Sequence, residues 1–220
     1  MYRACIFDLD GTLTDTLESL TYSVNTTLRI LGLSQITEEQ CKAFVGSGAR
    51  KLIERSLKAA GDSELIHIEK AMEVYGQIFK KNCTYQVAPY EGIADMLETL
   101  KGLGVKLAVL SNKPHVQTQD VVTTFFGNNT FTCVWGQQEG IPRKPDPTAV
   151  FMIAEDLSVA MDECLYIGDS DIDMKTGSAA GVTTIGVSWG FRSKKVLKEN
   201  GAIHIVDKAE EIISIVKGEQ

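Results

Sequence analysis

Two aspartates that stand two residues apart offer the strongest chemical signal in this chain. The sequence reads Ala4-Cys5-Ile6-Phe7 and then Asp8-Leu9-Asp10-Gly11. In an extended backbone, residues i and i+2 point to the same face, so the two carboxylates can share a site, and Gly11 permits a sharp turn after them. A carboxylate can attack phosphorus and form an aspartyl-phosphate, and a second one can protonate the leaving oxygen and later deprotonate water. We therefore expect Asp8 to be a nucleophile and Asp10 a general acid and base.

Two further segments carry side chains that suit the binding of a phosphate group. Ser111 and Asn112 follow an apolar run and can donate hydrogen bonds to phosphate oxygens. A helix that begins near Pro114 would also direct free N–H groups toward an anion. Lys144 is followed by two closely spaced prolines, and a lysine held in such a rigid segment suits the role of a point charge. We expect Lys144 to balance the nucleophile and the phosphoryl group.

An acidic cluster, residues 168–173, provides candidate metal ligands. Mg²⁺ prefers one or two carboxylates together with water and phosphate oxygens. Asp169 fits as such a ligand beside Asp8. Asp173 lies one helical turn later, where it can either hold a metal-bound water or orient Lys144. We expect Asp171 to point elsewhere as a solvated acid of the first helical turn.

The elements around these residues must bring them to one place. Ligands of parallel α/β sheets bind at the carboxyl ends of the strands. Apolar runs that predict strands lie at 3–7, 105–110, 131–135, 163–167, 182–187 and 202–206. Helical patterns lie between most of them, at 115–125, 147–157, 171–180 and 208–216. This alternation predicts a parallel sheet with crossover helices. Residues 16–83 show only helical patterns, which predicts a helical insertion after the first strand.

Composition excludes several classes of protein. The chain has 220 residues, of which 44% are hydrophobic, and a net charge of −7 without a basic run. This charge argues against a nucleic-acid partner. No apolar run approaches the roughly 20 residues that a membrane span needs, and the N-terminal apolar stretch is too short for a signal peptide. The five scattered cysteines favour reduced thiols, so we expect a cytoplasmic protein, either a monomer or a homodimer.

Taken together, the motifs resemble those of the haloacid dehalogenase superfamily, in its phosphoglycolate phosphatase-like branch. The matching segments are Asp8–Thr14, Leu110–Lys113, Lys144–Pro147 and Gly168–Asp173, in the order typical of that family. The resemblance implies an α/β fold with a Rossmann-like core, residues 1–15 and 86–220, and an inserted α-helical cap, residues 16–85. It also implies a Mg²⁺ ion held by Asp8, Asp169 and the backbone carbonyl of Asp10.

Two details refine this resemblance. The dehalogenase and phosphonatase members lack an acid two residues after the nucleophile, so Asp10 favours phosphate-ester chemistry. Gly46, Ser47 and Arg50 lie in a segment similar to the cap substrate loop of the phosphoglycolate phosphatase-like members. We expect Arg50 either to meet a substrate carboxylate or to be a solvated helix residue, and His115 either to face the cleft or to lie on a helix surface.

The function that these residues indicate is Mg²⁺-dependent hydrolysis of a small phosphomonoester, for which the branch suggests phosphoglycolate. A sugar phosphomutase of the β-phosphoglucomutase type would use the same Asp8 and Asp10, and an inorganic pyrophosphatase is also compatible. Outside the enzymes, a receiver-like domain also carries an acid cluster and a lysine on a parallel sheet, and a degenerate member of the family would only bind its ligand. Asp10 and the helical insertion argue against the receiver.

Overall fold

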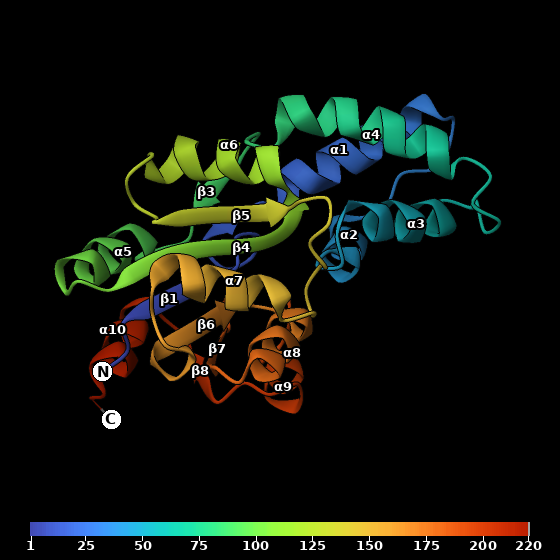
Figure 1. Cartoon of the computed structure of the whole chain (residues 1–220). Helices are drawn as coiled ribbons and strands as arrows, with labels where there is room; N and C mark the ends of the chain where they lie inside the picture. The colour runs from blue at the N-terminus through green and yellow to red at the C-terminus, as the bar shows by residue number, and fades with distance from the viewer. Residues whose placement is uncertain (220) are drawn as a thin grey trace.

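A six-stranded parallel sheet forms the centre of the molecule, with strand order β5-β4-β1-β6-β7-β8. The computed structural model describes residues 1–219 (Figure 1). The strands of this sheet are β1 Ala4–Phe7, β4 Lys106–Pro114, β5 Cys133–Gln137, β6 Cys164–Gly168, β7 Thr183–Val187 and β8 His204–Val206. All six strands were predicted from the apolar runs, and β4 continues four residues beyond its predicted end at Leu110.

Helices cover both faces of the sheet because its strands are apolar on both sides. Cys5 and Phe7 of β1 pack into one cluster, which includes residues of α5 (Ile93–Gly102), α6 (His115–Phe126) and α10 (Glu210–Lys217). Ala4 and Ile6 pack into another cluster with α7 (Thr148–Leu157) and the end of α8 (Asp171–Ala180). The alternation of side chains along β1 thus divides the core into two layers. A short helix, α9 (Lys194–Glu199), and a 3₁₀ turn, Met161–Glu163, were not predicted.

Four helices between residues 17 and 82 form a separate layer beyond the carboxyl ends of the strands (Figure 1). They are α1 Leu17–Ile30, α2 Glu38–Phe44, α3 Ala49–Ala59 and α4 Ile68–Asn82. Thr37 and Gln40 form a reciprocal capping box at the start of α2, which satisfies two backbone donors there. α4 begins at Ile68, shortly after Leu65, whose φ of 57° is not compatible with a helix. No helix in the described part of the chain combines the length and apolarity that crossing a bilayer requires.

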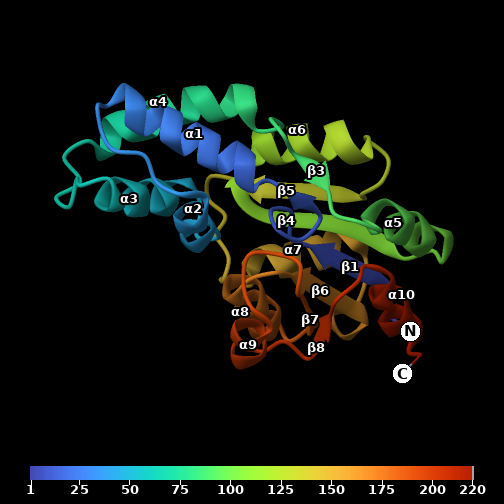
Figure 2. The same cartoon turned by 180° about the vertical axis from the view of Figure 1, so that it is seen from behind.

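Two short strands connect this helical layer to the core. β2 (Thr14–Asp15) and β3 (Ala88–Pro89) pair antiparallel, and Figure 2 shows them where the chain leaves and re-enters the core. Neither strand was predicted, since two residues are too few for a periodic pattern. The chain therefore crosses to the helical layer and back at one place.

A second connection comes from Arg192, in the loop between β7 and α9. Its guanidinium donates hydrogen bonds to the carbonyl oxygens of Lys42 at 2.7 Å, Ala43 at 3.3 Å and Val45 at 2.7 Å. Carbonyl groups in the last turn of a helix have no donor within the helix, and here an arginine of the core supplies it. Asn112 adds a bond from its Nδ2 to the carbonyl of Gly46 at 3.0 Å. These contacts hold the loop after α2 against the core.

We predict that Arg192→Met will loosen this loop. The loss of charged hydrogen bonds should lower the free energy of unfolding by on the order of 1–3 kcal/mol, and amide exchange over residues 43–48 should become faster. Hydrogen–deuterium exchange with mass spectrometry measures the effect. Lys195→Met, whose side chain is 82% exposed, is the matched control. Unchanged exchange over this segment in Arg192→Met would contradict the interpretation.

Candidate active site

Asp8 lies directly after β1, the central strand of the sheet. Its backbone N–H donates to the carbonyl of Ile167 at 2.9 Å, which continues the pairing with β6 one residue beyond the strand. One carboxylate oxygen, Oδ1, accepts the N–H of Leu9 at 2.7 Å and lies 2.9 Å from Lys144 Nζ. Burial and the charge of Asp173 raise the pKa of Asp8 to about 7, although Lys144 opposes the shift. The sheet therefore fixes this carboxylate at its edge with one oxygen bound.

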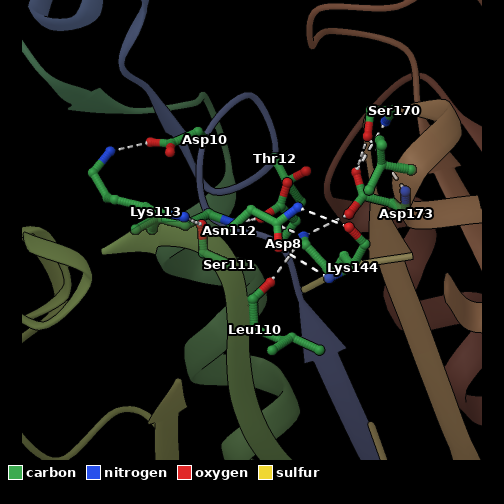
Figure 3. A network of polar contacts seen from close by, with 12 residues as sticks. Asp8, Asp10, Thr12, Leu110, Ser111, Asn112, Lys113, Lys144, Ser170 and Asp173 are labelled. Carbon is green, nitrogen blue, oxygen red and sulfur yellow. Dashed lines mark hydrogen bonds and ion pairs between the residues drawn. The ribbon is translucent and has the colours of Figure 1, made fainter. Parts of the chain in front are cut away.

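Lys144 is a buried cation with three partners. Its Nζ donates to the carbonyl of Leu110 at 3.0 Å, to Asp173 Oδ1 at 2.7 Å and to Asp8 Oδ1 at 2.9 Å (Figure 3). Burial disfavours its charge, but Asp173 and Asp8 outweigh this cost and hold the pKa of Lys144 well above its ordinary value. An ammonium group has three N–H donors, so Lys144 is both charged and fixed in direction.

Asp173 is the residue that orients Lys144, one of the two roles that the sequence left open. Its other carboxylate oxygen accepts from the backbone N–H of Ser170 at 3.1 Å and from the hydroxyl of Ser170 at 2.5 Å. A Cβ at Gly168 would lie 2.3 Å from Cβ of Asp173, so only glycine leaves room for this side chain. Both oxygens of Asp173 are thus occupied by protein donors.

Asp169 lies beside Asp8 at the end of β6. Its Oδ2 accepts the N–H of Phe191 at 2.6 Å, and a Cβ at Gly190 would lie 2.3 Å from its own Cβ. The loop 189–191 therefore packs tightly on this carboxylate. Burial and the charges of Asp173 and Asp8 raise the pKa of Asp169 well above its ordinary value.

The charges of this cluster leave room for a divalent cation. Carboxylate oxygens of Asp8, Asp169 and Asp173 lie within 4.8 Å of one another. When all three carboxylates are ionised, they and the ammonium of Lys144 sum to a charge of −2, which a divalent cation would neutralise. Oxygen ligands suit Mg²⁺. Asp8 has one oxygen without a recorded protein donor, and Asp169 Oδ1 accepts only a long bond of 3.5 Å from the Thr12 hydroxyl, whereas both oxygens of Asp173 accept shorter bonds. The residues present thus fit this ion.

Asp10 and Lys113 form a second ion pair in the site. Lys113 Nζ lies 2.5 Å from Asp10 Oδ1, and its side chain is 2% exposed. Figure 3 shows this pair on the opposite side of Asp8 from Lys144 and Asp173. The same nitrogen lies 5.1 Å from the ring centroid of Phe79 in α4. The sequence analysis quoted Lys113 only as part of a motif and gave it no role, since nothing in the sequence indicated that it turns toward Asp10.

Ser111, Asn112 and Gly11 lie around Asp8, but Asn112 differs from its predicted role. Its Nδ2 donates to the carbonyls of Gly46 at 3.0 Å and Lys144 at 3.1 Å, and its Oδ1 accepts from the Lys144 N–H at 3.0 Å. Both amide hydrogens are therefore used, and the side chain joins two loops rather than facing a phosphate. At Gly11, φ is 85° and a Cβ would lie 2.4 Å from Asp169 Oδ2, so this position requires glycine.

A cleft joins these residues to the helical layer, and the space within it, including the part open to solvent, is about 610 Å³. Its floor is polar and includes Asp8, Asp10, Ser111, Lys113, Lys144 and Asp169. Its other wall comes from the helical layer and is apolar, with Leu20, Val45, Leu52, Tyr75 and Phe79. Catalytic groups and a nonpolar cover thus face each other.

Of the three residues predicted to form a cap substrate loop, Gly46 lines the cleft, whereas Ser47 and Arg50 are not among its lining residues. Arg50 is 47% exposed and its guanidinium pairs with Glu69 at 2.7 Å and Glu54 at 3.5 Å. Because both partners lie on the helical layer itself, this arrangement matches the second of the two alternatives for Arg50, a solvated helix residue.

Other residues complete the comparison with the sequence. His115 does not line the cleft; its Nδ1 accepts the backbone N–H of Gly136 at 3.2 Å. Phe191 and Arg192, for which no site role was predicted, line the cleft. Asp171 is half-buried and pairs with Lys175 at 2.9 Å, away from the cluster as predicted.

Several known proteins are similar to this chain over most of its length. The chain is 32% identical to a phosphoglycolate phosphatase of Aquifex aeolicus over 193 residues, 86% of each protein. It is 29% identical to one of Pseudomonas savastanoi pv. phaseolicola over 216 residues, 96% of this chain and 78% of that protein. The crystal structure of a candidate phosphoglycolate phosphatase from Lactobacillus delbrueckii subsp. bulgaricus has a TM-score of 0.89 and 34% identity over 98% of both chains.

A family profile gives the same result over a long part of the chain. Residues 5–187 match the family described as haloacid dehalogenase-like hydrolase. This range contains Asp8, Asp10, Lys144, Asp169 and Asp173, together with the whole helical layer. The chain therefore belongs to the haloacid dehalogenase-like hydrolase family.

Proposed function

We propose that this protein hydrolyses a small phosphomonoester through a covalent phosphate on Asp8. The observation that carries the proposal is the buried contact of Asp8 with Lys144, 2.9 Å apart at the edge of the sheet. A carboxylate with one oxygen held by a fixed cation presents its other oxygen for attack. The phosphatases among the chain's relatives support the same reaction.

Mg²⁺ is the cofactor in this proposal. Asp8, Asp169 and the backbone carbonyl of Asp10 would hold it, and Asp173 would act from outside through Lys144. When bound, the ion neutralises the negative charge of the phosphoryl group and orients it toward Asp8. The charge of −2 on the cluster of three aspartates and Lys144 supports this assignment.

The protein's own residues account for both halves of the reaction. The free oxygen of Asp8 forms a bond to phosphorus while the bond to the leaving oxygen breaks, and Asp10 gives that oxygen its proton. The Ser111 hydroxyl and nearby backbone N–H groups bind the phosphoryl oxygens, and the positive charge of Lys144 offsets their negative charge. In the second half, Asp10 takes a proton from water, which attacks phosphorus and restores the Asp8 carboxylate.

The substrate in this proposal is a small monophosphate such as phosphoglycolate, the compound named in several relatives. The wall of Leu20, Val45, Leu52, Tyr75 and Phe79 offers one side-chain hydroxyl, that of Tyr75, which is few hydrogen bonds for the several hydroxyl groups of a sugar that a mutase would need to bind. Water remains the acceptor of the phosphoryl group.

Residues 16–85 act as a cap in this proposal and residues 1–15 and 86–220 as the core. The paired strands β2 and β3 would be the hinge, and closure would exclude bulk water from the cleft. A cytoplasmic location is supported by the five unpaired cysteines, since reduced thiols are typical of that compartment. Both a monomer and a homodimer are compatible with a cleft formed by one chain.

We predict that Asp8→Asn abolishes turnover, because an amide is not a usable nucleophile. Phosphate release from phosphoglycolate should fall by at least about 1,000-fold, and EDTA should remove the activity of the unmodified protein. Asp95→Asn, an exposed change on α5, is the matched control and should retain full activity. Metal-dependent release that persists in Asp8→Asn would refute the assignment of the nucleophile.

We also predict that Mg²⁺ stabilises the fold more at higher pH. In EDTA, the pKa of Asp8 is about 7 in the folded protein against 3.8 for an ordinary aspartate. Between these two pKa values the folded state binds more protons than the unfolded state. The free energy of unfolding therefore falls as the pH rises through this range, by at most about 1.4 kcal/mol for each pH unit. A divalent cation that binds the ionised carboxylates should reverse the loss.

Thermal melts between pH 5 and pH 8 provide the measurement for this prediction. The melting temperature in EDTA should fall toward pH 8, and the gain on adding Mg²⁺ should grow over the same interval. Asp8→Asn should show a shallower fall in EDTA because one of the titrating groups is gone. A gain from Mg²⁺ that does not depend on pH would count against a site built from these carboxylates.

A further inference from the structure

Lys113 differs from the other cations of the cleft in the number of its partners. Lys144 uses its three donors on Leu110, Asp173 and Asp8, and Arg192 is bound to carbonyls of the helical layer. Within residues 1–219, the only hydrogen bond recorded for Lys113 Nζ goes to Asp10. Two of its three N–H donors therefore remain available to a ligand.

The position of Lys113 places it beside the leaving group of the substrate. It contacts Asp10 at 2.5 Å, and Asp10 is the proposed proton donor to the leaving oxygen. Figure 3 shows Lys113 and Lys144 on opposite sides of Asp8. A phosphoryl group bound at the free oxygen of Asp8 has Lys144 on one side, so the rest of the substrate can extend toward Lys113 on the other.

The surroundings of Lys113 make it the natural partner of an anion. Its ammonium lies under the ring of Phe79, at 5.1 Å from the centroid, and its side chain is 2% exposed. A hydrogen bond to a charged group is stronger where water is excluded. The wall opposite, from Leu20 to Phe79, carries no charge, and Arg50 points outward. A negative group on the substrate has no other uncommitted cation on the described part of the cleft.

We propose that Lys113 recognises a carboxylate on the leaving group of the substrate and exchanges Asp10 for it on binding. The inference rests on the proposed function and deepens it: the substrate class becomes short monophosphates that carry a carboxylate near the ester oxygen. Before substrate binds, Asp10 occupies Lys113. A substrate carboxylate takes that place, and the carboxyl group of Asp10 is then free to turn toward the ester oxygen. Neutral substrates leave the ion pair intact.

Binding can be tested without turnover in the Asp8→Asn background with Mg²⁺ present. The probes are 2-phosphoglycolate and 2-hydroxyethyl phosphate, which differ in a carboxylate and a hydroxymethyl group. Calorimetric titration should show a preference for phosphoglycolate on the order of 10- to 100-fold. Adding Lys113→Met should remove most of this preference, whereas Lys113→Arg, which keeps the charge, should retain part of it.

Lys101→Met is the matched control, because Lys101 is exposed on α5 and bonds only to the carbonyl of Asn129; it should keep the full preference. Three results would each overturn the proposal: an unchanged ratio of the affinities for the two probes in Lys113→Met, an equal loss of affinity for both probes, or no preference for phosphoglycolate in the Asp8→Asn protein.

Circular dichroism confirms that each variant is folded. Phosphate release by the unmodified protein tests the proposed function separately. If the unmodified protein releases no phosphate but its preference for phosphoglycolate over 2-hydroxyethyl phosphate still depends on Lys113, the proposed reaction is refuted and the recognition of the carboxylate is supported.

Discussion

The structure depends on the balance of charge around the buried ammonium group of Lys144. A lysine enclosed by protein is stable as a cation only if nearby anions and acceptors compensate for lost water, and Asp173 and Asp8 do so at 2.7 and 2.9 Å. The same contacts hold the Asp8 carboxylate in place. Removing either acid leaves an unbalanced buried charge, so both the stability of the fold and the proposed reaction require these three residues.

The need to balance these charges explains why the polar residues lie together at the carboxyl ends of neighbouring strands. Asp8 follows β1, Asp169 follows β6, and Leu110, whose carbonyl binds Lys144, belongs to β4. These three strands are adjacent, with Phe7 opposite both Val109 and Ile167. Register therefore converts positions that are more than 100 residues apart in the sequence into neighbours. The tight contacts at Gly168 and Gly190 then fix the directions of Asp173 and Asp169.

The sequence was sufficient to predict the features that follow from regular patterns of residues. Apolar runs predicted every strand of the large sheet, and motif order predicted which side chains meet at its edge. It was insufficient to predict which of several possible partners a polar side chain contacts. The turn of Arg50 toward Glu69, of Asn112 toward Gly46 and of Lys113 toward Asp10 depends on three-dimensional neighbours. Two-residue strands such as β2 and β3 carry no periodicity, so the connection to the helical layer was also missed.

The two buried lysines show how different residues of one site can serve the reaction and the recognition of the substrate. Lys144 has its three donors directed at core residues, so it acts as a fixed charge beside Asp8 whatever the leaving group is. Lys113 has one partner in the core and an aromatic ring of α4 above it. Its surroundings thus change with the helical layer, whereas those of Lys144 do not. A substitution in α4 can therefore alter which leaving group is accepted without disturbing the charge balance around Asp8. Family membership together with Asp10 makes the proposed reaction predictable, but the choice of substrate depends on contacts between the two layers.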